Sequence, residues 1–410
     1  MVVDQQGFET NVGTSFINKG NIAQNDAFTV QKCREQGALL FGKTNMHEIG
    51  FDITTINKHW GATRNPLNMC HACGGSSGGS ACAVAANLCP LALGCDGGGS
   101  IRIPASFCGL YGLKPTYGRI SGHGGSGIAN SVGHTGPIAA TAYDLAVGYL
   151  VMAGMDPQDP MTLLQPPAYL PKSVRSTGRG IRIGIYRTYF EDAASTVVKT
   201  CNEFLDRMVS EMGVQLVDIV IPELEACRVA HVNLFGSEAR SLMTNAHSSR
   251  LLQLSPPTLA QVSVFANLEG ADYIQACRVR TFAMKQLESI FNHIDFIVTP
   301  ATACSAMPIK DGDLAHGLAN FSYTTLGTRF AFLGNLTGIP CVTIPIGSTT
   351  TFEAFKERVD ATQHPIPVSL QLMSTWWSEA SLIEMARMCE KLTATKSCNL
   401  KPEVEYHLLQ

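Results

Sequence analysis

The chain has few charged residues and almost no excess of one sign. Asp, Glu, Lys and Arg make up 15% of its 410 residues, against about 25% in an average soluble protein. The 30 basic and 33 acidic side chains give a formal net charge of −3. No positive excess is available to neutralise a phosphate backbone, so no nucleic-acid partner is expected. The hydrophobic share of 45% excludes intrinsic disorder, which requires low hydrophobicity and high net charge.

Long apolar runs and a leader sequence are also missing. No run reaches the roughly 18 residues that span a bilayer, and the longest stretches, 81–95 and 145–155, are typical of buried helices. Residues 1–7 contain no apolar core of the kind that a secretory signal peptide has. The sequence therefore predicts a cytoplasmic protein that is not secreted and that has at most a peripheral contact with an internal membrane.

The 14 cysteines do not form the pattern of a disulfide framework or of a zinc site. Disulfide frameworks belong to short secreted chains, so reduced thiols are expected here. Cys70 and Cys73 form one C-x-x-C, but no second pair follows at the spacing of a structural zinc site. The prediction is no metal and no cofactor, with the cysteines acting as small core residues.

Helical and strand patterns alternate along the chain, which indicates an α/β sheet protein. Residues 26–36 read as a helix that Asn25 or Asp26 can cap and that Gly37 ends. Further helices are expected over 81–86 and 195–211, and strands over 38–42, 91–94, 181–186, 216–221, 295–298 and 341–345. Residues 157–180 are rich in proline and serine, which predicts a linker that crosses the surface.

Three sequence motifs match known functional patterns but lack the context that those functions need. Residues 37–44 fit the phosphate-binding pattern G-x4-G-K-[ST], yet the apolar letters inside it favour a buried strand over a phosphate cradle. Residues 122–127 fit G-x-G-x-x-G without a strand before or a helix after, so a flexible loop is expected. Residues 75–79 fit the hydrolase elbow G-x-S-x-G, but the matching oxyanion motif at 123–125 follows it instead of preceding it.

Two Gly/Ser loops, at 74–80 and 96–104, carry the strongest chemical signal. Ser100 follows three glycines, whose unobstructed N–H groups can hold an oxyanion that develops on an attacked carbonyl. Glycine is expected here because a Cβ would keep the substrate from the backbone. Ser100 needs a base, and a second serine, Ser76, can relay its proton to a neutral lysine. Asp96 and Arg102, six residues apart, can brace the turn as a structural ion pair.

Residues 74–104 resemble the amidase signature family, whose pattern runs from G-G-S-S-x-G to D-x-G-G-S-[IV]-R-x-P. The resemblance continues through 42–48 and 112–116 and, near the C-terminus, through 335–340 and 370–372. Within the family the chain is most similar to plant-type fatty acid amide hydrolases, on the segments 63–66, 96–100 and 222–231. The resemblance implies a single domain over 1–410, with an α/β/α fold of three layers around a large mixed β-sheet.

The resemblance also implies a Ser–cisSer–Lys triad. Ser100 matches the nucleophile that is acylated, and Ser76 matches the bridging serine, whose peptide bond is cis in the family. The other matches are Gly97, Gly98 and Gly99 in the oxyanion hole, Gly50 at the bound substrate, and Ser77 as a support of the loop. The implied activity is a serine amidohydrolase for small-molecule acyl amides, such as N-acylethanolamines or fatty acid amides, in a homodimer. The alternatives are a non-catalytic amidase-like binding or regulatory protein and a glutamyl-tRNA(Gln) amidotransferase A-type subunit.

The chain departs from the family at the lysine of the triad. That lysine belongs to a V-K-[DE]-x-x-D segment, and if Asp4 matches its last acid, the lysine falls immediately before Met1. Lys43 and Lys114 belong to other family segments. We therefore expect a fold that is incomplete at the N-terminus and severely reduced hydrolysis. The substrate channel is expected within 150–290, with the apolar residues 262–268 in the core.

Overall fold

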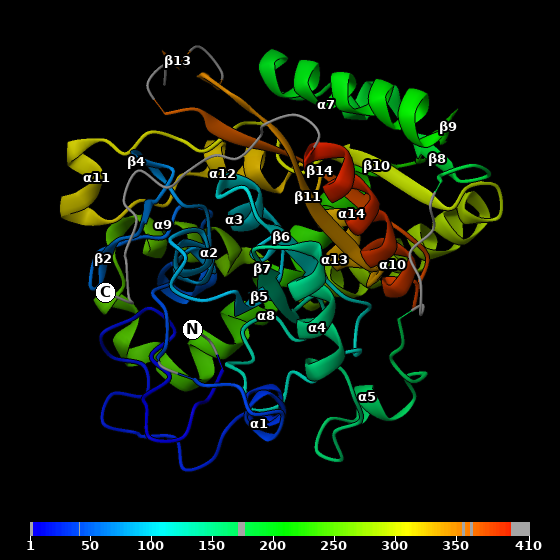
Figure 1. Cartoon of the computed structure of the whole chain (residues 1–410). Coiled ribbons are helices and arrows are strands. Elements are labelled where there is room, and N and C mark those ends of the chain that lie inside the picture. Colours follow the sequence, from blue (N-terminus) through cyan, green and yellow to red (C-terminus); the bar gives the residue numbers. More distant parts are fainter. Residues whose placement is uncertain (1–2, 41, 171–176, 355–356, 361–363, 395–410) are drawn as a thin grey trace.

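Eight strands form one mixed sheet at the centre of the protein (Figure 1). The computed structural model describes residues 3–40, 42–170, 177–354, 357–360 and 364–394. The strand order is β5 (Leu91–Asp96), β7 (His134–Ala139), β6 (Tyr111–Lys114), β11 (Cys341–Thr349), β14 (Ile366–Met373), β10 (Phe296–Pro300), β8 (Arg182–Ile185) and β9 (Gln215–Asp218). β8 pairs in parallel with β9 and β10, and the other neighbours are antiparallel.

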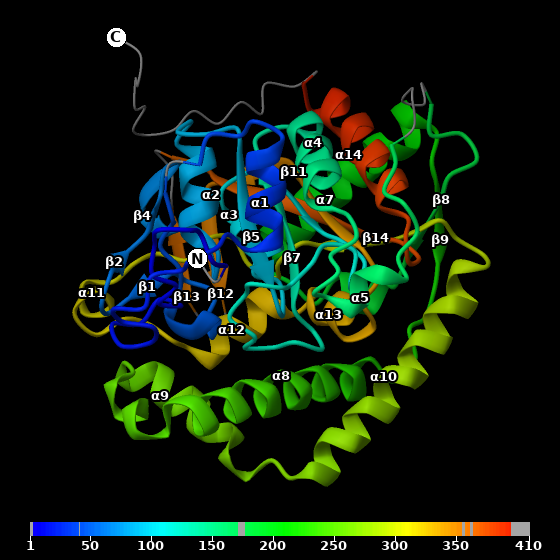
Figure 2. The same ribbon diagram turned by 90° about the horizontal axis from the view of Figure 1, so that it is seen from below.

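Both faces of the sheet are covered by helices, because successive side chains of its strands point to opposite sides. In β10, Phe296 and Val298 enter one core and Ile297 enters the other. The first core is closed by α4 (Ala142–Met152), α7 (Ser195–Arg207) and α14 (Glu379–Ala394), and the second by α8 (Leu224–His247), α10 (Gly270–Phe291) and α13 (Phe332–Thr337). Figure 2 shows α8 and α10 on the opposite side of the sheet from α4, α7 and α14. This is the expected three-layer α/β/α arrangement.

Shorter elements complete the structure around the sheet. The helices are α1 (Phe28–Glu35), α2 (Gly78–Ala85), α3 (Arg102–Phe107), α5 (Pro160–Leu163), α6 (Arg187–Phe190), α9 (Pro256–Val264), α11 (Asp311–His316) and α12 (Phe321–Thr328), with helical turns at Glu48–Gly50, Met208–Met212, Ser248–Gln253 and Phe265–Asn267. Two-stranded pairs are formed by β1 (Ile56–Asn57) with β2 (Gly61–Ala62), β3 (Arg64–Asn65) with β4 (Asn68–Ala72), and β12 (Thr351–Ala354) with β13 (Glu357–Asp360). Among the described residues, no helix is both long enough and apolar enough to cross a membrane.

The helix α2 packs unusually closely because its first residues have no side chain. A Cβ on Gly78 would lie 2.4 Å from the hydroxyl oxygen of Thr55, and one on Gly79 would lie 2.4 Å from the carbonyl oxygen of Asn45. Glycine is therefore required at both positions. This close contact fixes the position of the loop that precedes α2, which contains Ser76.

Most of the predicted elements are present, and one of them is wrong. The predicted helix over 26–36 is α1, and Gly37 ends it with a φ of +83°. Its N-cap is Ala27, while Asp26 accepts the backbone N–H of Gln6 instead of capping the helix. The strand expected over 38–42 is not found in the described part of this segment. Leu39 is 91% exposed, and of the described residues in this run it is Leu40 that packs against the core.

The proline-rich segment predicted as a linker is in part a packed strap. α5 lies within it, and the guanidinium of Arg119 donates to the carbonyl oxygens of Pro166 and Pro167, the latter at 3.1 Å. Gln165 donates to the carbonyl oxygen of Tyr117 at 3.2 Å and accepts from the indole of Trp377 at 2.8 Å. Residues 171–176 of the predicted linker lie outside the described residues. The described part lies mostly on the surface and is anchored beside the loop at 117–119.

Candidate active site

The two Gly/Ser loops meet in one pocket of about 380 Å³, which both Ser76 and Ser100 line. Ser76 follows a cis peptide bond with Gly75, as the family resemblance implies, and lies just before α2. Ser100 lies between β5 and α3. Ser77 joins the two loops, because its N–H donates to the carbonyl oxygen of Ser100 at 3.3 Å. Its hydroxyl also bonds the backbone N–H and carbonyl of Cys95, each at 3.2 Å, which is the supporting role predicted for Ser77.

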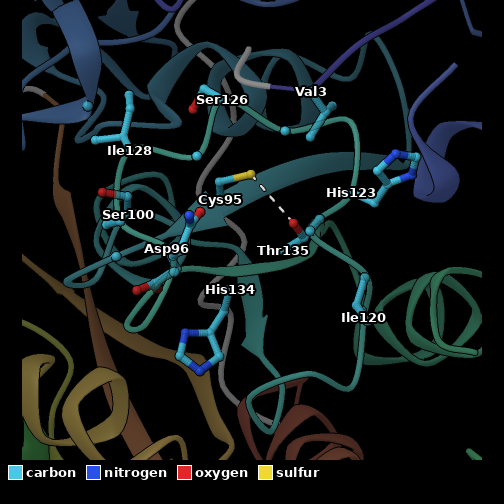
Figure 3. A pocket seen from close by; sticks show the side chains of 18 of the residues that line it. Val3, Cys95, Asp96, Ser100, Ile120, His123, Ser126, Ile128, His134 and Thr135 are labelled. Carbon is cyan, nitrogen blue, oxygen red and sulfur yellow. Dashed lines mark hydrogen bonds between the residues drawn. The ribbon is translucent and has the colours of Figure 1, made fainter. Parts of the chain in front are cut away.

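The walls of the pocket come mainly from the first third of the chain. Figure 3 shows Cys95 and Thr135 between Ser100 on one side and His123 and Ile120 on the other. The residues contributed by the range 150–290 are Gln158, Asp159, Met161 and Phe235. The region 150–290, where the substrate channel is expected, thus contributes four residues to this pocket, and the loops that follow β5 and β6 contribute most of the others. Of the segment 262–268, Val262 and Phe265 are in the core, as expected, and Val264 is exposed.

The turn before Ser100 is held by Asp96, and three of its four predicted oxyanion donors are free. One carboxylate oxygen of Asp96 accepts the N–H of Gly99 at 2.6 Å, and the other accepts the N–H of Ile101 at 3.1 Å. Within the described part of the chain, the N–H groups of Gly97, Gly98 and Ser100 make no hydrogen bond. They are the donors of this turn that remain available to an oxyanion.

The three glycines before Ser100 also lie close to protein side chains. A Cβ on Gly97 would lie 3.0 Å from the ring of Phe235, and one on Gly98 would lie 3.1 Å from Cε1 of His231. A Cβ on Gly99 would come within 2.7 Å of Ile103 and 2.9 Å of Ala331. The glycines thus let the turn fit among these side chains, and room for a substrate remains a second reason that we expect for them.

Gly50 faces the reactive groups directly. It has a φ of +72°, and a Cβ on it would lie 3.5 Å from the hydroxyl oxygen of Ser76. The preceding residue, Ile49, has a φ of +45°, which is rare for a β-branched residue, and its side chain is buried beside the pocket. This sharp turn brings the backbone of Gly50 against Ser76.

Asp96 and Arg102 form the ion pair that their spacing predicts, and both side chains are fully buried. Nε and Nη2 of Arg102 donate to the two carboxylate oxygens, each at 3.0 Å. Arg102 also donates to the side chains of Asn335 and Gln371 and to the carbonyl of Ala331. Burial alone would raise the pKa of Asp96, but the charge and hydrogen bonds of Arg102 hold it well below its ordinary value. The pair is part of the core beneath the turn.

No site for a metal ion is apparent in the described part of the chain. It contains no group of three or more His, Cys, Asp or Glu side chains arranged to hold one. The 13 cysteines of the described residues, including Cys70 and Cys73, are free thiols. The pocket brings the hydroxyl groups of Ser76 and Ser100 together beside backbone N–H groups that have no partner among the described residues.

Comparison with known proteins assigns the chain to one family. The profile described as Amidase matches residues 2–383. The chain belongs to the amidase family. The fatty acid amide hydrolase of Arabidopsis thaliana is 35% identical over 98% of this chain, which spans 64% of that relative's length. The A-type subunit of the glutamyl-tRNA(Gln) amidotransferase of Koribacter versatilis is 30% identical over 96% of this chain and 83% of its own.

The fold of this amidase-family chain matches solved structures along nearly all its length. One is a chain of the vestigial complex that reveals the evolutionary origins of an s-triazine catabolic enzyme. It has a TM-score of 0.84 and 28% identity, over 97% of this chain and 83% of that one. The positions of Ser76, Ser100, Gly50 and Gly97 in one pocket are thus seen on the fold that the family shares.

No lysine lines the pocket of this amidase-family chain within the described residues. Nζ of Lys43 donates to the hydroxyl of Thr10 at 2.7 Å and to the carbonyl of Glu9 at 3.0 Å, and burial lowers the pKa of Lys43 to about 8. Nζ of the fully buried Lys114 donates to the carbonyl of Pro115 at 2.9 Å, and burial lowers its pKa to about 8. Both amines thus donate hydrogen bonds to groups that do not line the pocket.

The sequence analysis did not predict that His231 and Phe235 reach the site. Both lie on α8, and Nε2 of His231 is 2.7 Å from the carbonyl oxygen of Gly97, which is 134 residues away. Phe235 lines the pocket. The spacing of four residues places the two side chains on one face of a helix, but nothing in the sequence shows what that face contacts. His134, also in the pocket, donates Nδ1–H to the carbonyl of Val132 at 2.9 Å, and burial holds its pKa well below the ordinary value.

Proposed function

We propose that this chain is a serine amidohydrolase that cleaves acyl amides through an acyl-enzyme on Ser100. The observation that supports it most directly is that the hydroxyls of Ser76 and Ser100 line the same pocket, beside backbone N–H groups with no other partner in the described chain. Membership of the amidase family and the similarity to a fatty acid amide hydrolase support the same reaction.

The reaction would proceed in two stages at Ser100. Its hydroxyl oxygen attacks the amide carbonyl carbon while Ser76 accepts the hydroxyl proton and passes its own proton to a base. The N–H groups of Gly97, Gly98 and Ser100 stabilise the oxyanion. Collapse of the tetrahedral intermediate expels the amine, which takes up a proton, and leaves an ester on Ser100. Water then hydrolyses the ester to the carboxylic acid and restores the hydroxyl.

The scheme needs a base that accepts the proton from Ser76. The amines of Lys43 and Lys114 are hydrogen-bonded to groups outside the pocket, and none of the described residues that line the pocket is a lysine. A positioned general base contributes about 10²- to 10⁴-fold. We therefore propose that these 410 residues form the acyl-enzyme slowly. The same observation favours the alternative of an amidase-like protein that binds acyl amides without turning them over.

An apolar acyl group fits the lining of the pocket best. Its apolar side chains are Val3, Ile49, Ile120, Ile128, Met161 and Phe235. Burial of such surface stabilises binding by about 25 cal/mol per Å², so longer acyl chains should bind more tightly. N-acylethanolamines and other fatty acid amides are the substrates we propose. Because such molecules partition into lipid, a peripheral contact of this chain with an internal membrane is part of the proposal.

A glutaminase role is the second candidate, because the chain is 30% identical to the Koribacter versatilis amidotransferase component. That role requires release of ammonia from glutamine in the presence of partner subunits. Hydrolysis of lauroyl ethanolamide without any ammonia release from glutamine would exclude it for this chain.

The test of the main proposal is covalent labelling. A fluorophosphonate probe should modify Ser100, identified by mass spectrometry of the peptides, and the Ser100→Ala variant should take up no label. Replacement of the exposed Ser263 of α9 by Ala serves as the control and should leave labelling unchanged. Label on another residue, or equal labelling of the Ser100→Ala variant, would overturn the proposal. Labelling of Ser100 without turnover of lauroyl ethanolamide would favour the binding protein.

A further inference from the structure

His231, which does not line the pocket, holds the turn that precedes Ser100. Its Nε2 lies 2.7 Å from the carbonyl oxygen of Gly97. A carbonyl oxygen only accepts hydrogen bonds, so Nε2 carries the proton and donates it. The side chain is 6% exposed, and burial lowers its pKa to about 4, which keeps the ring neutral near pH 7. A neutral ring with Nε2–H is the tautomer that this contact requires.

The face of α8 that carries His231 fits the glycines closely. Phe235, one helical turn later, stacks on the His231 ring with 6.4 Å between the ring centroids and 26° between their planes. A Cβ on Gly98 would lie 3.1 Å from the ring of His231, and a Cβ on Gly97 would lie 3.0 Å from the ring of Phe235. The two rings therefore pack closely against the glycines of this turn.

The direction of the Gly97 carbonyl determines the direction of the next N–H. In a planar trans peptide the C=O and N–H groups point in opposite directions, and the bond between Gly97 and Gly98 is not among the cis bonds. The carbonyl points at His231, which does not line the pocket, whereas Gly97 and Ser100 do. The Gly98 N–H, which has no partner among the described residues, is thereby turned away from His231.

We propose that His231 is a positioning residue, which orients the Gly97–Gly98 peptide so that the Gly98 N–H donates to the oxyanion formed at Ser100. The role rests on the proposed acyl-enzyme mechanism, because the oxyanion forms only when Ser100 attacks the amide carbonyl. His231 touches no reacting atom in this scheme. Without its hydrogen bond the peptide between two glycines can rotate, since neither residue has a Cβ to restrict it.

The test compares two replacements of similar length, His231→Gln and His231→Met. Gln keeps an N–H donor that can reach the Gly97 carbonyl, and Met fills the space without one. The readouts are the rate constant of Ser100 labelling by a fluorophosphonate and the kcat and KM for p-nitrophenyl butyrate, whose leaving group needs no proton. H231M should lower the labelling rate and kcat about 10- to 100-fold with little change in KM, and H231Q should stay within about threefold of the parent.

Controls separate this role from a structural one and from the proposed function itself. His71→Leu removes another buried histidine, which does not line the pocket, and should label at the parental rate. If H231M does not fold, H231Q and His231→Phe supply the comparison, since Phe keeps a ring without the donor. Equal rates for the variants with and without a donor would overturn the proposal while leaving the acyl-enzyme intact. Absence of label on Ser100 in the parent would instead overturn the acyl-enzyme.

Discussion

Asp96 and Arg102 form a two-point ion pair in which neither side chain is exposed to solvent. The same carboxylate accepts the N–H groups of Gly99 and Ile101, on either side of Ser100. Arg102 in turn reaches Gln371 of β14 and the carbonyl of Ala331. The turn that carries Ser100 is thus fixed to the middle of the sheet by a charge pair that has no access to water.

Loss of Arg102 should therefore unfold much of the protein. Arg102→Met leaves Asp96 buried without its counter-charge, which typically costs about 3–5 kcal/mol. The matched control is Arg228→Met, because Arg228 pairs with Glu225 on the exposed surface of α8, where such pairs contribute about 0–1 kcal/mol. Urea unfolding followed by circular dichroism measures both. Similar losses for the two variants would show that the buried network contributes no more than a surface pair.

A methyl group at position 50 should slow the labelling of Ser100, while the loss of thermal stability should be no larger than at a control glycine. Gly50→Ala places its Cβ 3.5 Å from the hydroxyl of Ser76, in a left-handed backbone conformation that costs about 1–2 kcal/mol for Ala. Gly37→Ala is the matched control, since Gly37 has a φ of +83° and nothing within 4 Å of its Cβ position. Both variants should lose similar thermal stability, and only Gly50→Ala should label more slowly at Ser100. Equal labelling of the two would remove Gly50 from the site.

A small amine in solution should partly replace the base that the described pocket does not supply. The rate of Ser100 labelling by a fluorophosphonate should rise with methylamine concentration at constant pH, because the free amine can accept the proton that Ser76 relays. Labelling is the readout because it stops before water or amine attacks the acyl-enzyme. Tetramethylammonium at equal ionic strength, which has no free electron pair, should have no effect. A labelling rate that is independent of methylamine would mean that the pocket already contains a base.

The sequence predicted the site where its parts are close along the chain. Asp96 and Arg102 are six residues apart, and the turn between them allows few arrangements, so their ion pair could be expected and is confirmed. Short apolar runs predict the strands β5, β8, β9, β10 and β11, which the structure contains. Local chemistry was sufficient for both.

The parts that sequence reasoning missed depend on packing between distant segments. His231 reaches Gly97 because one face of α8 packs against the turn after β5, and no periodic pattern encodes that contact. The prolines of 157–180 predict a linker on the surface, but they do not show that Arg119 binds the carbonyls of Pro166 and Pro167. The apolar run at 38–42 predicts a strand, but of its described residues it is Leu40 that packs against the core. In each case the deciding partner lies far away in the chain.

Acid should destabilise the protein in part through His71. This side chain is 3% exposed, neither ring nitrogen has a hydrogen-bond partner among the described residues, and burial lowers its pKa from 6.5 to about 4. Between those two values the unfolded chain takes up a proton and the folded chain does not, so the free energy of unfolding falls as the pH falls from about 6.5 toward 4.

His71→Leu removes this effect and should gain about 2 kcal/mol on the parent between pH 8 and pH 5. Urea unfolding at both pH values measures the gain, with replacement of the exposed His293 by Leu as the control. A difference between His71→Leu and the parent that is the same at both pH values would show that His71 is protonated as easily in the folded chain as in the unfolded one.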